Sequence, residues 1–103
     1  MTEPFVYAFE WDPVKATENV AKYSVAFEIA ASVLRDPLAL TVYDPEHGGT
    51  EERWVSIGRA EDGKLLVLVH TFEETGATGA TVRIISAREA TKRERENYEE
   101  APR

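Results

Sequence analysis

The longest uninterrupted apolar run in this chain is the five-residue segment from Leu65 to Val69, and it constrains the fold more than any other feature. It is far too short for the ~20 residues that span a membrane, but it has the length of a buried strand. Asp62 and Gly63, just before it, form a pair that is typical of hairpin turns. We therefore expect residues 65–72 to be the central strand of an antiparallel sheet.

Further strands are predicted on both sides of this segment. Short stretches rich in β-branched and aromatic residues alternate with turn signals, which gives strands at 38–43, 52–59, 65–72 and 81–87. A polar cluster from Asp44 to Gly49 separates the first two strands, and Gly76 to Gly79 separates the last two. Strands that follow one another through hairpins form a four-stranded antiparallel meander.

An N-terminal strand and two helices are predicted before the meander. Residues 5–11 are typical of a strand, which ends at Asp12 and Pro13. Asp is a preferred helix N-cap and Pro suits the first helical turn, so a helix is expected to run from here to about residue 23. A second helix over 26–34 should end before Pro37, because the residue before a proline disfavours helix.

A third helix is predicted at the C-terminus. Thr91 and Glu94 have the spacing of a capping box, and the helix should continue to about Glu100. The order of elements indicates an α+β fold in which helices pack on a curved antiparallel sheet. We expect residues 1–103 to form a single domain.

Composition restricts the classes of function. The chain has no cysteine and only two histidines, which excludes thiolate metal sites and leaves too few ligands for a typical zinc site. No signal peptide is visible at the N-terminus, so we expect a cytoplasmic protein with no membrane segment, no metal and no cofactor. The net charge of -7 counts against generic nucleic-acid binding, but five of the twelve cations lie within residues 83–95.

Several short strings, in a fixed order, carry a resemblance to a known family. They are FEWDPVK at 9–15 with Asn19 after it, KYSVAFE at 22–28, DPEH at 44–47, and RIISAREATKRER at 83–95. Each string is weak alone, but the ordered set is specific and extends over residues 9–99. The chain resembles the BrnT family of bacterial toxins.

This resemblance implies a fold, an activity and a partner. The implied fold is RelE-like, and the implied activity is an RNA cleavage that arrests translation. The implied partner is a BrnA-like antitoxin with a ribbon-helix-helix DNA-binding module. The family also implies a homodimer, or a heterotetramer with the antitoxin.

The chain departs from the family pattern at two informative positions. Tyr23 stands where the family has a histidine, and Phe72 stands where an arginine is common. Each change removes a group that can bind phosphate or transfer a proton. Two functions therefore stay open, an active endoribonuclease and a catalytically degenerate homologue that only binds an antitoxin or another partner.

Metal-free RNA cleavage requires proton transfer and stabilisation of the charge on phosphate. The residues that we assign to this chemistry are Arg83, Arg88, Arg53 and His47. The three arginines would hold phosphate, and His47 would transfer protons. The alternatives are ion pairs with neighbouring carboxylates for the arginines and a turn histidine without a partner for His47.

Strand alternation gives an expected direction for Arg83. It places Arg83 on the sheet face opposite to Val82, Ile84 and Ser86. Because the helices must cover one face, Arg83 is expected on the open one. His70, at the end of the central strand, is expected to be a buried histidine with its hydrogen bonds satisfied.

Four further cations are assigned to RNA binding. Lys15 and Lys22 are seven residues apart, so they share one face of the first predicted helix. Lys92 and Arg93 begin the C-terminal helix and would contact RNA or the antitoxin. The alternative for all four is an ordinary solvated surface.

Overall fold

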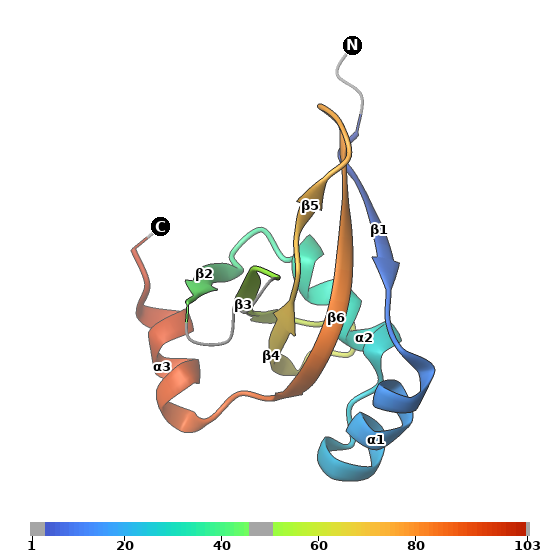
Figure 1. Cartoon of the computed structure of the whole chain (residues 1–103). Helices are drawn as coiled ribbons and strands as arrows, with labels where there is room; N and C mark the ends of the chain where they lie inside the picture. Colours follow the sequence, from blue (N-terminus) through green and yellow to red (C-terminus); the bar gives the residue numbers. More distant parts are fainter. Residues whose placement is uncertain (1–3, 46–50, 103) are drawn as a thin grey trace.

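The computed structural model describes residues 4–45 and 51–102. Along the chain (Figure 1) the elements are β1 (Val6–Glu10), α1 (Pro13–Tyr23), α2 (Phe27–Ala31), the 3₁₀ helix η1 (Ser32–Arg35), β2 (Leu40–Asp44), β3 (Arg53–Arg59), β4 (Leu65–His70), β5 (Glu73–Glu74), β6 (Gly79–Glu89) and α3 (Lys92–Glu100). The α+β class predicted from the sequence is confirmed. Within the described residues, no helix is long and apolar enough to cross a membrane.

The sheet contains the predicted four-stranded meander and two further strands, β1 and β5. The strand order is β1-β6-β4-β3-β2, and the pairs from β2 to β6 along this path are antiparallel, as expected. β1 joins the other side of β6 as a parallel strand, with Val6 opposite Gly79 and Glu10 opposite Arg83. The two-residue strand β5 also pairs with β6, and the sequence did not predict it because two residues are too short to show alternation. In Figure 1, β1, β5 and one half of β6 extend from the rest of the molecule as a narrow arm.

The first two helices cover one face of the sheet and build the core. α1 begins as predicted, because the Asp12 carboxylate accepts a hydrogen bond from Val14 N at 2.8 Å. Trp11 packs edge-on against Phe27, with 5.9 Å between the ring centroids. The buried core residues are Val25, Phe27, Ala30, Ala31, Val33, Ala60, Leu66, Leu68, Ile84 and Ala87. This face is called the helix face of the sheet. The opposite face buries Leu65 and Val67, and α3 packs on it near Arg59 and Arg88. It is called the open face for its other end, where Arg53 and Arg83 lie.

Asn19 closes the edge of β6 that β1 leaves unpaired. β1 pairs only with residues 79–83, so the second half of β6 has a free edge beside α1. The buried Asn19 side chain donates to Ala87 O at 2.8 Å and to Val25 O at 2.9 Å, and it accepts from Ala87 N at 3.1 Å. It therefore replaces the peptide of a neighbouring strand, which gives this asparagine a structural role.

A β-bulge changes the direction of side chains along β6. Val69 of β4 lies opposite Ser86, whereas His70 lies opposite Ile84, so Ile85 is the extra residue. Ile84 and Ala87 are both buried although they are three residues apart. The expectation that Ser86 lies on the face opposite to Arg83 is therefore wrong, because the bulge reverses the alternation between them.

The C-terminal helix confirms the predicted cap and lies on the far side of the molecule from α1 (Figure 1). The Thr91 hydroxyl accepts from Glu94 N at 3.2 Å, while the Glu94 carboxylate accepts from Thr91 N at 2.8 Å. Near its end, the buried Tyr98 donates its hydroxyl proton to Asp36 Oδ2 at 2.6 Å. Asp36 Oδ2 also accepts from Arg59 N at 2.7 Å, so one carboxylate ties α3 to β3.

Candidate functional site

The three candidate arginines lie on the open face of the sheet, and the bulge in β6 brings two of them, Arg83 and Arg88, to the same side. With strict alternation, Arg83 and Arg88 would point to opposite faces, because they are five residues apart. After the bulge, Arg88 and Ser86 lie on the same face as Arg83. Arg53 of β3 lies on this face too, since its neighbour Trp54 is level with His70 on the helix face.

Arg53 and Arg83 are level with each other across the sheet, with Thr71 between them. Thr71 N donates to Arg83 O at 2.9 Å, and Arg83 N donates to the Thr71 hydroxyl at 3.0 Å. Two strand spacings separate the backbones of Arg53 and Arg83, which is about 10 Å. Both side chains can therefore approach one phosphodiester chain that crosses the open face.

Carboxylates surround Arg83. Its guanidinium forms an ion pair with Glu51, and both side chains are nearly half exposed. A cavity of about 270 Å³ beside this pair is lined by Glu10, Glu51, Glu52, Thr71, Phe72, Glu73, Thr81 and Arg83. Four carboxylates against one guanidinium give this lining a net charge of −3. For Arg83 the structure thus shows an ion pair with a carboxylate, which was the alternative to phosphate binding. A phosphate would have to displace Glu51 to bind this guanidinium.

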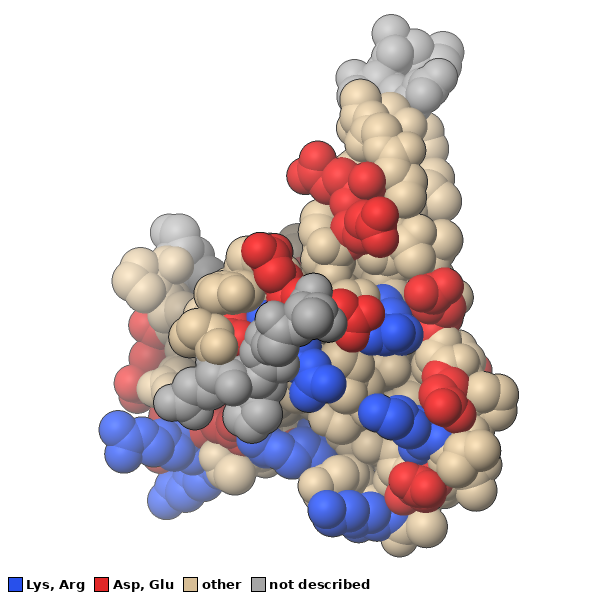
Figure 2. Space-filling view, in the orientation of Figure 1, with Lys and Arg blue, Asp and Glu red and all other residues tan. Residues whose placement is uncertain are grey.

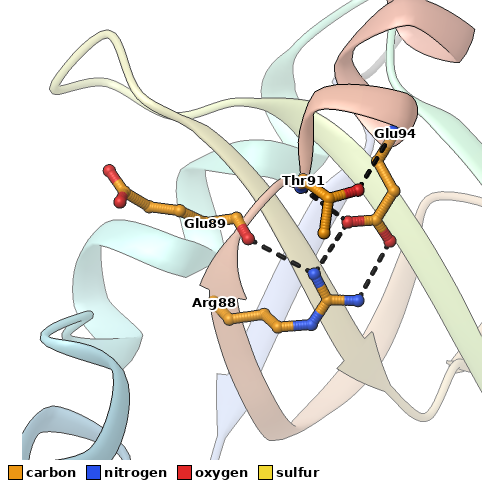
Figure 3. Close-up of polar contacts among 4 residues, drawn as sticks. All are labelled: Arg88, Glu89, Thr91 and Glu94. Carbon is orange, nitrogen blue, oxygen red and sulfur yellow. Dashed lines mark hydrogen bonds and ion pairs between the residues drawn. The ribbon is translucent and has the colours of Figure 1, made fainter.

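Arg88 is engaged by the first turn of α3, as Figure 3 shows. Its guanidinium makes two parallel hydrogen bonds to Glu94, at 2.7 Å to Oε1 and 2.9 Å to Oε2. These bonds hold the pKa of the Glu94 carboxyl at about 2, well below its ordinary 4.5. Arg88 consequently fastens α3 to the end of β6.

Arg53 differs from the other two arginines because no carboxylate of the described residues forms an ion pair with it. It makes no hydrogen bond or ion pair to the residues that the structure describes, and its buried Nε has no partner. A buried donor without a partner is unfavourable, and a bound anion would satisfy it. Among the three arginines, Arg53 is the one available to a phosphate without breaking an existing contact.

Lys15 and Lys22 border a groove of about 250 Å³ between α1 and β6. Its lining is Lys15, Glu18, Asn19, Lys22, Tyr23, Ile85 and Ser86, so the groove reaches the open face at Ser86. Lys22 Nζ lies 5.1 Å from the centroid of the Tyr23 ring. The pKa of Arg88 is raised, mainly by its hydrogen bonds to Glu94.

Lys92 and Arg93 lie apart from the other candidates, on α3. They line a shallow depression of about 510 Å³ together with Glu96, Asn97 and Glu100. No ion pair engages either cation among the described residues, although carboxylates are close. Figure 2 shows Lys and Arg over the lower half of the visible face, where Asp and Glu lie among them, whereas the charged side chains visible higher up are acidic.

Of the two histidines, the structure describes His70 but not His47. His47 lies outside the described residues, so its assignment to proton transfer stays a prediction. His70 is buried, as expected, and its Nδ1 is 2.8 Å from Thr71 O, a carbonyl that can only accept. Nδ1 therefore carries the proton, and Nε2 accepts from the Ser56 hydroxyl at 2.8 Å. Burial also lowers the pKa of His70 below 6.5, which keeps the ring neutral.

Sequence reasoning gave ion pairs as the alternative role of the arginines, but it did not identify the carboxylate partners. Glu94 was predicted to cap α3, but its bond to Arg88 depends on how the chain turns between β6 and the helix. Glu51 reaches Arg83 from 32 residues away, a separation at which no local pattern gives a signal. Within the described residues, no cluster of three or more His, Asp or Glu side chains is arranged to hold a metal ion.

Comparison with known proteins gives one family and one fold. Residues 11–94 match the family described as "Ribonuclease toxin, BrnT, of type II toxin-antitoxin system". The fold is similar to a crystal structure of the Brucella abortus ribonuclease toxin BrnT, with a TM-score of 0.57 and 19% sequence identity, over 84% of this chain and 97% of that one. No curated protein matches the sequence. The family match extends over most of the chain, and the chain therefore belongs to the BrnT family of ribonuclease toxins from type II toxin-antitoxin systems.

Proposed function

We propose that this chain is an active, metal-independent endoribonuclease that arrests translation in the cytoplasm and is neutralised by a BrnA-like antitoxin. The observation that carries the proposal is the open face of the sheet. There the bulge in β6 aligns Arg83 and Arg88 on the face that carries Arg53, and two lysines of α1 that form no ion pair within the described residues border the same face. An RNA chain on this face would run from the α1 groove past Ser86 to Arg53.

The residues on this path have distinct roles in the proposal. Lys15 and Lys22 attract the RNA backbone, and Arg53 holds the phosphate at which cleavage occurs. Arg83 joins Arg53 on that phosphate once Glu51 has moved away. Arg88 has a positioning role, because its ion pair with Glu94 holds α3 against the end of β6.

Proton transfer is assigned to His47 on the basis of chain connectivity. The segment that contains His47 leaves the sheet at Asp44 and returns at Arg53, and these two residues are opposite each other in the β2–β3 pair. Both ends of the segment are therefore fixed beside the proposed phosphate site. A histidine titrates near neutral pH, which suits it to removing the 2′-hydroxyl proton or protonating the leaving oxygen.

A second function is a toxin homologue that only binds its partner. It is favoured by the ion pairs that Arg83 and Arg88 already form with Glu51 and Glu94. If these pairs persist when RNA is present, Arg53 is the remaining strand arginine for the transition-state charge. Activity should then be lost while antitoxin binding is kept.

The test compares growth and RNA integrity after induction in a bacterial host. The unmodified chain should arrest growth with loss of RNA, and Arg53→Ala with Arg83→Ala should relieve both effects. Arg95→Ala is a control, because it removes an arginine of α3 whose partner in an exposed ion pair is Glu99. Purified protein should cleave RNA equally well with EDTA present. Equal growth of all cultures, with folded protein in each, would support the partner-binding function instead.

A further inference from the structure

A second cavity lies on the helix face of the sheet, at the base of the arm. It has a volume of about 340 Å³ and is lined by Thr41, Trp54, His70, Phe72 and Glu74. Around it are aromatic side chains with large exposed areas, since Tyr43 is 44% exposed and Phe72 is 36% exposed. Tyr43 packs edge-on against Trp54 at 5.1 Å, and the proposed RNA path on the open face uses none of these residues.

The polar atoms at the bottom of this cavity are already paired. His70 uses both ring nitrogens, one with Thr71 O and the other with the Ser56 hydroxyl. Because Ser56 donates to His70, the Thr41 hydroxyl must donate to Ser56, over 2.7 Å. The cavity thus has few donors with which to read the polar edge of a nucleobase, and its aromatic walls suit an apolar side chain.

Acidic residues surround the cavity. Glu74 lines it directly, and Phe72 separates it from the cavity that contains Glu10, Glu52 and Glu73. These four carboxylates form no ion pair within the part of the chain that the structure describes. Figure 2 shows acidic side chains over the upper half of the molecule, where the arm lies. Such a surface attracts cations.

We propose that this aromatic cavity docks a basic segment of the antitoxin, with one apolar anchor in the cavity and flanking Lys or Arg side chains on Glu73 and Glu74. Charge complementarity and the exposed aromatic walls carry the assignment. The identity of the partner as antitoxin rests on the proposed function. A cation bound at Glu73 would lie in the same cavity as Arg83 and Glu51, so the docked segment would also hinder access of RNA to Arg83.

The test uses two synthetic peptides that differ only in charge, acetyl-Lys-Arg-Leu-Leu-Arg-Lys-amide and its all-Glu counterpart at the four charged positions. Binding is followed by NMR through the indole N–H signal of Trp54. The Trp11 indole, which packs against Phe27 in the core, is the internal control. We expect the basic peptide to shift the Trp54 signal, with weaker binding at higher salt, and the acidic peptide to leave it unchanged.

Charge-reversal variants locate the flanking contacts. Glu73→Lys with Glu74→Lys should weaken binding of the basic peptide at least fivefold, whereas Glu96→Lys with Glu100→Lys on α3 makes the same charge change and should alter it less than twofold. Equal shifts with both peptides would overturn the proposal. So would a shift of Trp54 by hexauridylate, or a shift that depends on protein concentration and so indicates a second copy of the chain. No RNA cleavage is measured, so an inactive enzyme would leave the result interpretable.

Discussion

Replacement of Glu94 by Gln is expected to lower the free energy of unfolding at pH 7 by about 1–2 kcal/mol. Hydrogen bonds from Arg88 hold the pKa of Glu94 at about 2 instead of 4.5. If fully realised, a difference of this size corresponds to roughly 3 kcal/mol. The Glu94 side chain is 24% exposed and that of Arg88 39%, so solvent screening reduces the value. Gln also fits the capping box with Thr91, so the variant changes mainly the charge.

The sign of the pH dependence follows from the depressed pKa. The pair stabilises the folded state fully above pH 4.5, where the carboxylate is ionised in both states, and this stabilisation is lost as the pH falls toward 2. Urea unfolding of both proteins at pH 7, 4 and 3 should show a difference that shrinks on acidification. Glu99→Gln is the control, because Glu99 lies 3.9 Å from Arg95 in an exposed pair and should contribute less than about 0.5 kcal/mol. A Glu94→Gln difference that is absent at pH 7, or that grows at pH 3, would refute the reasoning.

Three further perturbations test the fold and the site. Asn19→Ala should cost about 2–4 kcal/mol in urea unfolding, because it leaves the buried N–H and C=O of Ala87 without partners, and a cost below ~1 kcal/mol would contradict that role. Since burial lowers the pKa of His70, stability should fall as the pH drops below 6.5, with net proton uptake on unfolding; a urea midpoint that is higher at pH 5.5 than at 7.5 would be inconsistent with this. Glu51→Gln should release Arg83 and tighten binding of a short single-stranded RNA about threefold in a filter assay, whereas unchanged or weaker binding would exclude Arg83 from the RNA site.

Local sequence signals predicted the helix starts and the meander well. The cap at Asp12 and the capping box at Thr91 involve contacts within three residues, so the sequence contains both partners at a fixed spacing. The strands from β2 to β6 are close to one another along the chain, and this leaves few ways to pair them. These features depend on neighbours in the chain, which is why periodicity and turn residues were sufficient.

Features that depend on distant residues were not predicted. The parallel pairing of β1 with β6 joins segments about 70 residues apart, and alternation in either strand does not specify a partner. The bulge at Ile85 follows from how β4 and β6 fit together, so the direction of Ser86 was wrong. The arginines were sensible candidates by residue type, but their carboxylate partners became visible only when the strands were assembled.

An acidic protein can bind RNA when its cations are separated in space from its carboxylates. The number of cations that are free to bind phosphate then sets how strongly RNA binding depends on salt. Arg83 and Arg88 form ion pairs with carboxylates, whereas Arg53, Lys15 and Lys22 form no ion pair within the described residues. Three phosphate contacts to a single strand predict a slope of about −2 for the logarithm of the association constant against the logarithm of salt concentration. Fluorescence anisotropy of a labelled RNA between low and moderate salt would measure it. A slope near about −4 would mean that Arg83 and Arg88 also release their carboxylates to bind phosphate, while a slope near zero would remove the open face from RNA binding.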